Sequence, residues 1–302
     1  MEIRKFITAV LCLLVPAAVF SQNASVEKAA ALFSSKEYSA ALAELEKTSP
    51  VSQNDRETAA YYKTLCKIYL SAPDAPQAVD DYLKQYPASI RKVEVITAMA
   101  DTYFNTGRYA EALDYYTLTD KFAINQKPVR DDFAYRKAYC QYATGDYAAA
   151  RPAMYSLLQS ERWGNDAAYA YGHMCYSEGD MTLALENFNR VAQDPKYRDK
   201  IPFYLANIYF GQKKYDRSIE EGEKLLSWYK GEQDTAPVRK IIGQSYFNLG
   251  RYDKALPYLE QSVSSPSASS FHCLTSNPGA NFSHEAKDLT AVSESGLPPN
   301  QQ

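Results

Sequence analysis

The chain of 302 residues has little glycine, histidine or tryptophan, and neither sign of charge is in strong excess. It holds 12 Gly, 3 His and 2 Trp, and its formal net charge is −3. A net charge this small gives no broad basic field of the kind that holds nucleic acid or anionic membranes. The scarcity of glycine and β-branched residues, beside abundant alanine and 26 Tyr, favours helices over sheets.

The motifs of common enzyme classes are also missing. The sequence contains no glycine-rich phosphate loop, no GxSxG and no HExxH. His173 has no cysteine or carboxylate around it at metal-ligand spacing. The five cysteines form no metal or disulfide framework, and Cys66, Cys140 and Cys175 are expected to be small buried hydrophobes. We therefore expect a protein that is not an enzyme and has no cofactor or metal.

A long apolar run occurs at the start of the chain and does not recur. Two basic residues precede an apolar stretch at 6–20, and the small residue Ser21 follows it. This order predicts a secretory signal peptide over 1–21, cleaved before Gln22. The stretch is shorter than the ~20 residues of a membrane-spanning helix. Because Cys12 lies inside the stretch rather than after it, we expect no lipid anchor, and hence a soluble protein exported to the periplasm.

One phrase occurs twice with little change, as NTGRYAEALDYY at 105–116 and NLGRYDKALPYL at 248–259. A wider pattern contains it, in which a small residue recurs at spacings of 37, 34, 38, 34, 34 and 37. These residues are Ala29, Cys66, Ala100, Ala138, Gly172, Ala206 and Gly243. Nine positions after each stand Tyr38, Ala75, Tyr109, Tyr147, Met181, Tyr215 and Tyr252, and three further on stand Ala41, Ala78, Ala112, Ala150, Ala184, Ser218 and Ala255. A basic period of 34 residues predicts seven structural repeats.

The pattern resembles the tetratricopeptide repeat (TPR) family. The third and seventh repeats fit the family's pattern best. That pattern has a small residue at position 8, an aromatic at 11, Gly near 15, Tyr near 17 and a small residue at 20. The third repeat reads Ala100, Tyr103, Gly107, Tyr109 and Ala112, and the seventh reads Gly243, Tyr246, Gly250, Tyr252 and Ala255. The second repeat departs from the pattern, with Pro73 and Ala75 in place of Gly and Tyr. The resemblance implies an all-α, right-handed solenoid of about seven helix-turn-helix units over 22–263.

The physical interpretation of the pattern is a stack of antiparallel helical pairs. Small residues at positions 8 and 20 let the two helices of a pair approach closely. Glycine at the turn adopts the left-handed conformation that ends the first helix with little strain. One pair cannot bury its own apolar face, so neighbouring repeats stack and leave a concave side.

Residues 264–302 differ in composition from the array. They contain no Tyr, hold His272 and His284, and are rich in Ser, Pro and Asn. We expect this tail to be disordered, because it cannot bury enough apolar surface to offset its chain entropy. It stands where an eighth repeat or a capping helix would follow, so the tail is interpreted as a non-native or truncated end of a longer array. An uncapped end also predicts self-association.

The resemblance further implies that the first helix of each repeat lines the concave groove. Positions 5, 9 and 12 of the fourth to sixth repeats are mostly aromatic, and these residues form the predicted partner-binding site: Tyr135, Tyr139, Tyr142, Tyr169, His173, Tyr176, Phe203, Asn207 and Phe210. Aromatic side chains at helical spacing are also typical of a packed core, and at position 12 both interpretations stay open.

The sequence therefore predicts an exported, non-enzymatic scaffold that binds a protein or peptide partner of unknown identity in an aromatic groove. The alternative is a carbohydrate-binding module that uses the same aromatic residues. A third hypothesis, a regulatory fragment of a longer enzyme, requires a catalytic region beyond residue 263. The length of the array and its many tyrosines also resemble, more weakly, exported TPR proteins of Bacteroidota. Contact with a membrane is expected only through partners.

Overall fold

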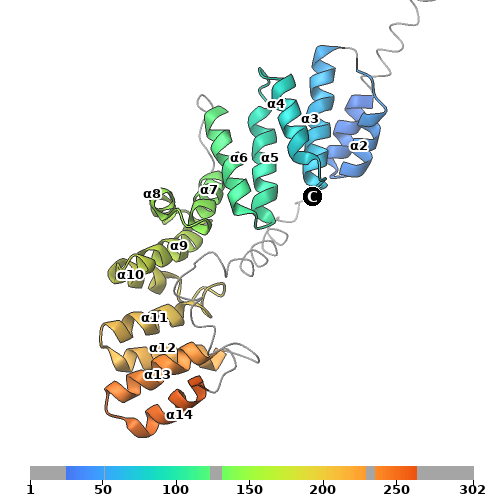
Figure 1. The fold of residues 1–302 in the computed structure, drawn as a ribbon. Coiled ribbons are helices and arrows are strands. Elements are labelled where there is room, and N and C mark those ends of the chain that lie inside the picture. Colours follow the sequence, from blue (N-terminus) through green and yellow to red (C-terminus); the bar gives the residue numbers. More distant parts are fainter. Residues whose placement is uncertain (1–24, 51, 123–130, 229–234, 264–302) are drawn as a thin grey trace, which may run out of the picture. The chain divides into compact units, whose positions relative to one another are not determined.

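A computed structural model describes residues 25–50, 52–122, 131–228 and 235–263 (Figure 1). The chain divides into two compact units, an N-terminal unit that ends at Pro128 and a C-terminal unit that begins at Val129. The described residues form helices and no strands, which confirms the predicted all-α fold. The predicted signal peptide at 1–21 and the predicted tail at 264–302 lie outside the described residues.

Each unit consists of consecutive helical pairs. The N-terminal unit pairs a helix over 25–34 with α2 (Tyr38–Glu46), α3 (Gln53–Tyr69) with α4 (Ala75–Gln85), and α5 (Lys92–Asn105) with α6 (Tyr109–Phe122). The C-terminal unit pairs α7 (Asp131–Ala143) with α8 (Tyr147–Leu157), α9 (Gly164–Ser177) with α10 (Met181–Val191), α11 (Ile201–Gly211) with α12 (Tyr215–Trp228), and α13 (Ala236–Asn248) with α14 (Tyr252–Val263). The described residues thus contain the seven predicted pairs.

Each pair turns at one residue in the left-handed region of backbone space. Four of the turns use glycine and three use another residue: Gly107, Gly145, Gly179, Gly250, Lys36, Ser71 and Lys213. In the fourth and fifth repeats an aspartate follows the glycine and caps the second helix. The Asp146 carboxylate accepts a hydrogen bond from the backbone N–H of Ala149 at 3.2 Å, and Asp180 accepts one from Leu183 at 3.1 Å. The Gly-Asp dipeptide therefore ends one helix and starts the next.

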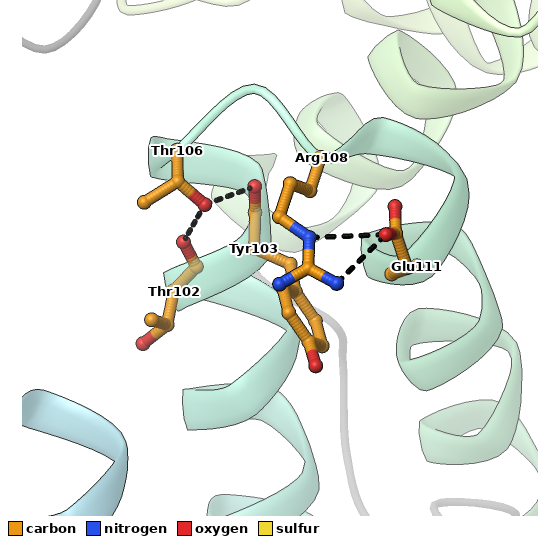
Figure 2. Close-up of polar contacts among 5 residues, drawn as sticks. All are labelled: Thr102, Tyr103, Thr106, Arg108 and Glu111. Atoms are coloured by element: carbon orange, nitrogen blue, oxygen red, sulfur yellow. Dashed lines mark hydrogen bonds and ion pairs between the residues drawn. The ribbon is translucent and has the colours of Figure 1, made fainter. Parts of the chain in front are cut away.

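The third repeat fixes the same turn with different side chains (Figure 2). The Thr106 hydroxyl donates to the carbonyl oxygens of Thr102 at 3.0 Å and Tyr103 at 3.1 Å, at the end of α5. The Arg108 guanidinium lies 4.3 Å from the centre of the Tyr103 ring and donates to Glu111 at 2.8 and 3.0 Å. Arg108 thus connects the last turn of α5 to the first turn of α6.

The left-handed turns give a first prediction. A Cβ atom at Gly179 would meet nothing within 4 Å, so Gly179→Ala adds backbone strain without a clash. We expect it to lower the free energy of unfolding by about 1 kcal/mol. The reverse change at Lys213, where φ is 59°, relieves strain but gives the unfolded chain more freedom. Lys213→Gly should therefore raise stability, by about 0.5 kcal/mol. Urea unfolding of both variants checks the pair, and shifts of equal sign would contradict it.

The small residues that set the repeat pattern lie between the helices. All seven at position 8 are buried, and six of the seven at position 20 are buried as well. The exception is Ala78, which is half-buried. In the second repeat α4 instead buries Ala75, Val79 and Tyr82. Ala75 and Tyr82 hold the repeat positions that Tyr109 and Tyr116 hold on α6, so α4 keeps its register, and Ala78 between them is only half-buried.

Candidate functional site

The predicted site residues belong to α7, α9 and α11, the first helices of the fourth to sixth repeats. On α7 the three tyrosines are nearly inaccessible, with exposed fractions of 1% for Tyr135, 6% for Tyr139 and 1% for Tyr142. Neighbouring rings on this helix contact each other at centroid distances of 5.8 and 5.7 Å. Tyr135 also stacks on Trp163 at 4.2 Å, with ring planes 7° apart. These tyrosines are part of a packed aromatic cluster.

Tyr169 on α9 is buried in the same way. Its ring stacks on Tyr197 at 4.5 Å, with planes 14° apart. The Tyr197 hydroxyl donates a hydrogen bond to Asp166, and the Lys196 ammonium pairs with the same carboxylate at 2.5 Å. Burial and the charge of Asp166 raise the pKa of Tyr197. The loop between α10 and α11 therefore supplies the ring that covers Tyr169.

His173 lies between two tyrosines with its ring perpendicular to both. Its centroid is 5.6 Å from that of Tyr142 at 86°, and 5.6 Å from that of Tyr204 at 90°. In the part of the chain that the structure describes, Nδ1 of His173 is buried and has no hydrogen-bond partner. Burial lowers the pKa of His173 from 6.5 to about 4, so the imidazole is neutral at pH 7. Its side chain as a whole is half-buried.

The remaining predicted residues are also half-buried. Tyr176 contacts Tyr204 at 5.3 Å, and Phe203 contacts the same ring at 5.8 Å. The Asn207 amide donates to the carbonyl oxygen of Phe203 on its own helix at 2.7 Å. Phe210 packs on Tyr215 at 5.7 Å. Four of the nine predicted residues are therefore buried, and five of them reach the surface in part. Whether they bind a partner stays a prediction.

The comparisons with known proteins agree with the fold described above. Two family models match the chain, at residues 97–166 and 241–268, and each is described as a tetratricopeptide repeat. The chain contains tetratricopeptide repeats. No curated protein matches the sequence in the comparison.

Several solved structures of MamA resemble the TPR array. A MamA point mutant is 18% identical with a TM-score of 0.50, and the match covers 60% of this chain and 98% of that one. MamA MSR-1 is 16% identical with a TM-score of 0.49, covering 57% and 95%. A further crystal structure of MamA is 17% identical with a TM-score of 0.46, covering 69% and 99%. The identity of 18% to the MamA point mutant means that this match shows the fold alone.

The TPR positions explain two of the site residues. The ring at position 12 packs across the turn on the tyrosine at position 17 of its own repeat, in at least five repeats. The pairs and their centroid distances are Phe33–Tyr38 at 5.3 Å, Phe104–Tyr109 at 5.7 Å, Tyr142–Tyr147 at 5.8 Å, Phe210–Tyr215 at 5.7 Å and Phe247–Tyr252 at 5.2 Å. For Tyr142 and Phe210 this contact supports the interpretation of position 12 as part of the packing.

Sequence reasoning missed Tyr204, which stands at position 6 of its repeat and not at an expected groove position. Its ring contacts five others at 4.8 to 6.5 Å: Tyr169, His173, Tyr176, Phe188 and Phe203. It stacks closely on Phe188, at 4.8 Å and 20°. One indication of this role lies in the sequence. Phe203 and Tyr204 are consecutive on one helix, so only one of the two rings can lie in the predicted stripe.

Other kinds of site find little support among the described residues. No three potential metal-ligating side chains gather there, and no helix in that part of the chain is both long and apolar enough to cross a bilayer. A shallow polar depression between α3 and α4 is lined by Lys63, Lys67, Asp74 and Asp81, among others. Its Lys67 ammonium is paired with Asp74 at 2.7 Å, so that cation is already neutralised within the fold.

The low pKa of His173 predicts a pH effect on stability. The folded pKa of about 4 is below the ordinary 6.5, so the unfolded chain takes up the proton first as the pH falls. The contribution of neutral His173 to the free energy of unfolding is therefore complete above pH 6.5 and is lost as the pH falls from 6.5 to 4. We expect His173 to contribute a loss of about 1–2 kcal/mol between pH 7.5 and 5. Urea unfolding at both pH values measures it. His173→Phe should remove that part of the pH dependence, and an unchanged dependence would contradict the assignment.

Proposed function

We propose that the protein is a non-enzymatic scaffold that binds a peptide segment of a partner protein at the half-buried side chains of α9 and α11. The observation that carries the proposal is the cluster of half-buried side chains that His173, Tyr176 and Phe203 form around the Tyr204 ring. The neutral imidazole of His173 adds no charge to this cluster. The half-buried rings of Tyr176 and Phe203 give apolar contact area beside it.

The buried tyrosines support this surface by holding it rigid. Tyr135, Tyr142 and Tyr169 are each fixed by contacts with other rings, so little side-chain motion is lost on binding. Stacked TPR helical pairs form an extended surface that can bind a partner protein without rearranging. The proposed binding site is thus smaller than the stripe of nine residues that the sequence predicts.

The stacking pattern favours a protein partner over a glycan. Sugar rings bind across the open faces of aromatic side chains. In this unit one face of Tyr135, Tyr169 and Tyr204 is already covered by another ring, at 4.2, 4.5 and 4.8 Å respectively. Tyr135 and Tyr169 are also only 1% and 6% exposed, so neither ring offers an open face to a sugar.

The test uses the full chain as bait in an envelope extract of its source organism, with recovered proteins identified by mass spectrometry. His173→Phe keeps the ring contacts and removes Nδ1, and Tyr176→Ala removes contact area. Tyr155→Ala is the matched control, since Tyr155 is 64% exposed on α8 of the same unit. A partner held by wild type and control should bind Tyr176→Ala roughly five- to tenfold more weakly, the loss of one aromatic contact, while His173→Phe should bind as wild type does. Equal recovery by all baits would refute the proposed site, and saturable binding on a glycan array without a protein partner would favour the alternative.

We also propose that the protein is exported to the periplasm, on the strength of the signal-peptide pattern at 1–21. Expression in the source organism should yield a mature chain that begins at Gln22, which intact-mass measurement detects. A chain that retains residues 1–21 in the cytoplasm would contradict this.

The last helix supplies a prediction about self-association. Tyr252, Leu256 and Val263 lie on one side of α14 and are 61%, 57% and 75% exposed. Apolar side chains exposed side by side favour association of two copies. We expect light scattering to show a mass that rises with concentration, and Leu256→Glu to abolish the rise. Glu260→Gln, an exposed change on the same helix, is the control. A constant monomer mass for the wild type up to high concentration would contradict the prediction.

A further inference from the structure

The second repeat, in the N-terminal unit, exposes side chains that other repeats cover. Its position 17 is Ala75, so Leu70 at position 12 has no tyrosine across the turn to pack on. Leu70 is 40% exposed, and the neighbouring Tyr69 is 45% exposed. By contrast, Phe104 and Tyr103 at the same positions of the third repeat are 8% and 7% exposed. The departure from the repeat pattern thus leaves an open aromatic surface.

Four rings from three helices form this surface, which we name the aromatic platform: Phe33, Tyr38, Tyr62 and Tyr69. Tyr69 stacks on Tyr38 at 4.9 Å, with planes 24° apart. Phe33 contacts the other three at 5.1 to 5.8 Å. Phe33, Tyr38 and Tyr62 are half-buried. The platform is therefore held in place by its own contacts while the Tyr69 end is open to solvent.

Two carboxylates of α5 act on the open end of the platform. Burial raises the pKa of Tyr69, and the negative charges of Asp101 and Glu94 raise it further. The Asp101 carboxylate accepts a hydrogen bond from the Tyr116 hydroxyl at 2.5 Å, which fixes its position. Glu94 is exposed. The groups that act on Tyr69 are thus negative, and an electron-rich ring beside negative charge attracts cations.

The neighbouring cations are engaged elsewhere. Lys67 on α3 pairs with Asp74 at 2.7 Å. Arg91, which precedes α5, lies 5.0 Å from the centre of the Tyr61 ring and donates to the Thr58 hydroxyl at 2.9 Å. Arg91 on Tyr61 also shows, within the same unit, the contact that a planar guanidinium makes with a tyrosine face.

We propose that the aromatic platform binds an arginine side chain of a partner protein, with the guanidinium stacked on Tyr69 and balanced by Glu94 and Asp101. Arginine fits better than lysine because its planar cation continues a stack of rings and is less strongly hydrated than an ammonium. The site lies in the N-terminal unit and is independent of the His173 surface in the C-terminal unit. A partner could engage either site without the other.

The experiment is fluorescence anisotropy with the full chain and a fluorescein-labelled glycine peptide that carries two arginines. The same peptide with citrulline in place of both arginines keeps the shape and removes the charge. Tyr69→Ala and Glu94→Gln test the platform. Tyr155→Ala and Glu186→Gln, exposed residues of the C-terminal unit, are matched controls. Far-UV circular dichroism and thermal melting establish that each variant is folded.

We expect saturable binding of the arginine peptide at low salt, weakened about fivefold by Tyr69→Ala, the size of one exposed cation–π contact. Glu94→Gln should weaken binding about threefold and reduce its salt dependence. Should Tyr69→Ala not fold, Glu94→Gln decides, since its side chain is exposed. Equal binding of the citrulline peptide, no binding by the wild type, or equal affinity of the platform and control variants would overturn the proposal. His173→Phe should leave this binding unchanged, so failure here is distinct from failure of the proposed function.

Discussion

Ala112→Asp is expected to lower the free energy of unfolding of the N-terminal unit by about 4 kcal/mol or more, the range for an unpaired charge placed in a core. Ala112 is fully buried on α6, at the position where the repeat pattern requires a small side chain. A carboxylate there either loses its hydration or forces α5 and α6 apart. In a stack of repeats each interface supports the next, so the loss should extend to the packing of α3 against α5.

Ala110→Asp is the matched control for this variant. It is the same substitution two residues earlier on α6, at an exposed position in the first turn. Negative charge near the start of a helix is favourable, so we expect a change within about 0.5 kcal/mol of wild type. Urea unfolding followed by circular dichroism compares the two variants. Similar midpoints for both would mean that α6 does not bury Ala112 as described.

The repeat period could be predicted because it rests on sterically required residues. Small residues at position 8 are buried in all seven repeats, and a left-handed residue lies at each turn. Three of those turn residues are not glycine, among them Ser71 and Lys213. Lys36 and Lys213 stand at position 15, where four other repeats have glycine, so the register of those repeats predicts their conformation. Ser71 stands two residues before Pro73, the residue at position 15 of its repeat, so the register does not predict it. The pattern therefore determines six of the seven turns, two of them at residues that do not favour the left-handed conformation.

The candidate site was harder to predict, because burial of a side chain depends on what covers it. Tyr135 is covered by Trp163 and Tyr169 by Tyr197, and both covering residues come from connections between repeats. Repeat positions say nothing about the path of such connections. The central place of Tyr204 has another origin: it lies on α11 at position 6, where its ring stacks on Phe188 of α10. Position within a repeat thus predicts the direction of a side chain better than its exposure.

The second repeat shows the complementary effect. The sequence shows directly that Ala75 stands at position 17 in place of tyrosine. It does not show which neighbouring side chains this replacement exposes. Leu70, the residue at position 12 that such a tyrosine would cover, is 40% exposed. A deviation from a repeat pattern is consequently a better indication of an open surface than the aromatic stripe itself.

Glycine at position 8 of the last repeat should be more sensitive to a single methyl group than any exposed glycine. A Cβ atom at Gly243 would lie 2.7 Å from Cγ and 2.8 Å from Cδ2 of Leu259, and 3.2 Å from the Leu259 backbone nitrogen. The side chain can shift, but the backbone nitrogen belongs to α14 and moves only with that helix. We therefore expect Gly243→Ala to destabilise the C-terminal unit by about 2 kcal/mol, as overpacked interfaces do.

The control is the same substitution at Gly211, the last residue of α11, where a Cβ atom would meet nothing within 4 Å. Alanine is the better helix former, so Gly211→Ala should raise stability by about 0.5 kcal/mol. Identical chemical changes are thus expected to have opposite signs, which urea unfolding of the two variants resolves directly. If Gly243→Ala were also stabilising, α13 and α14 would not be in the close contact that the position-8 glycine implies, and helix propensity would outweigh packing at the end of the array.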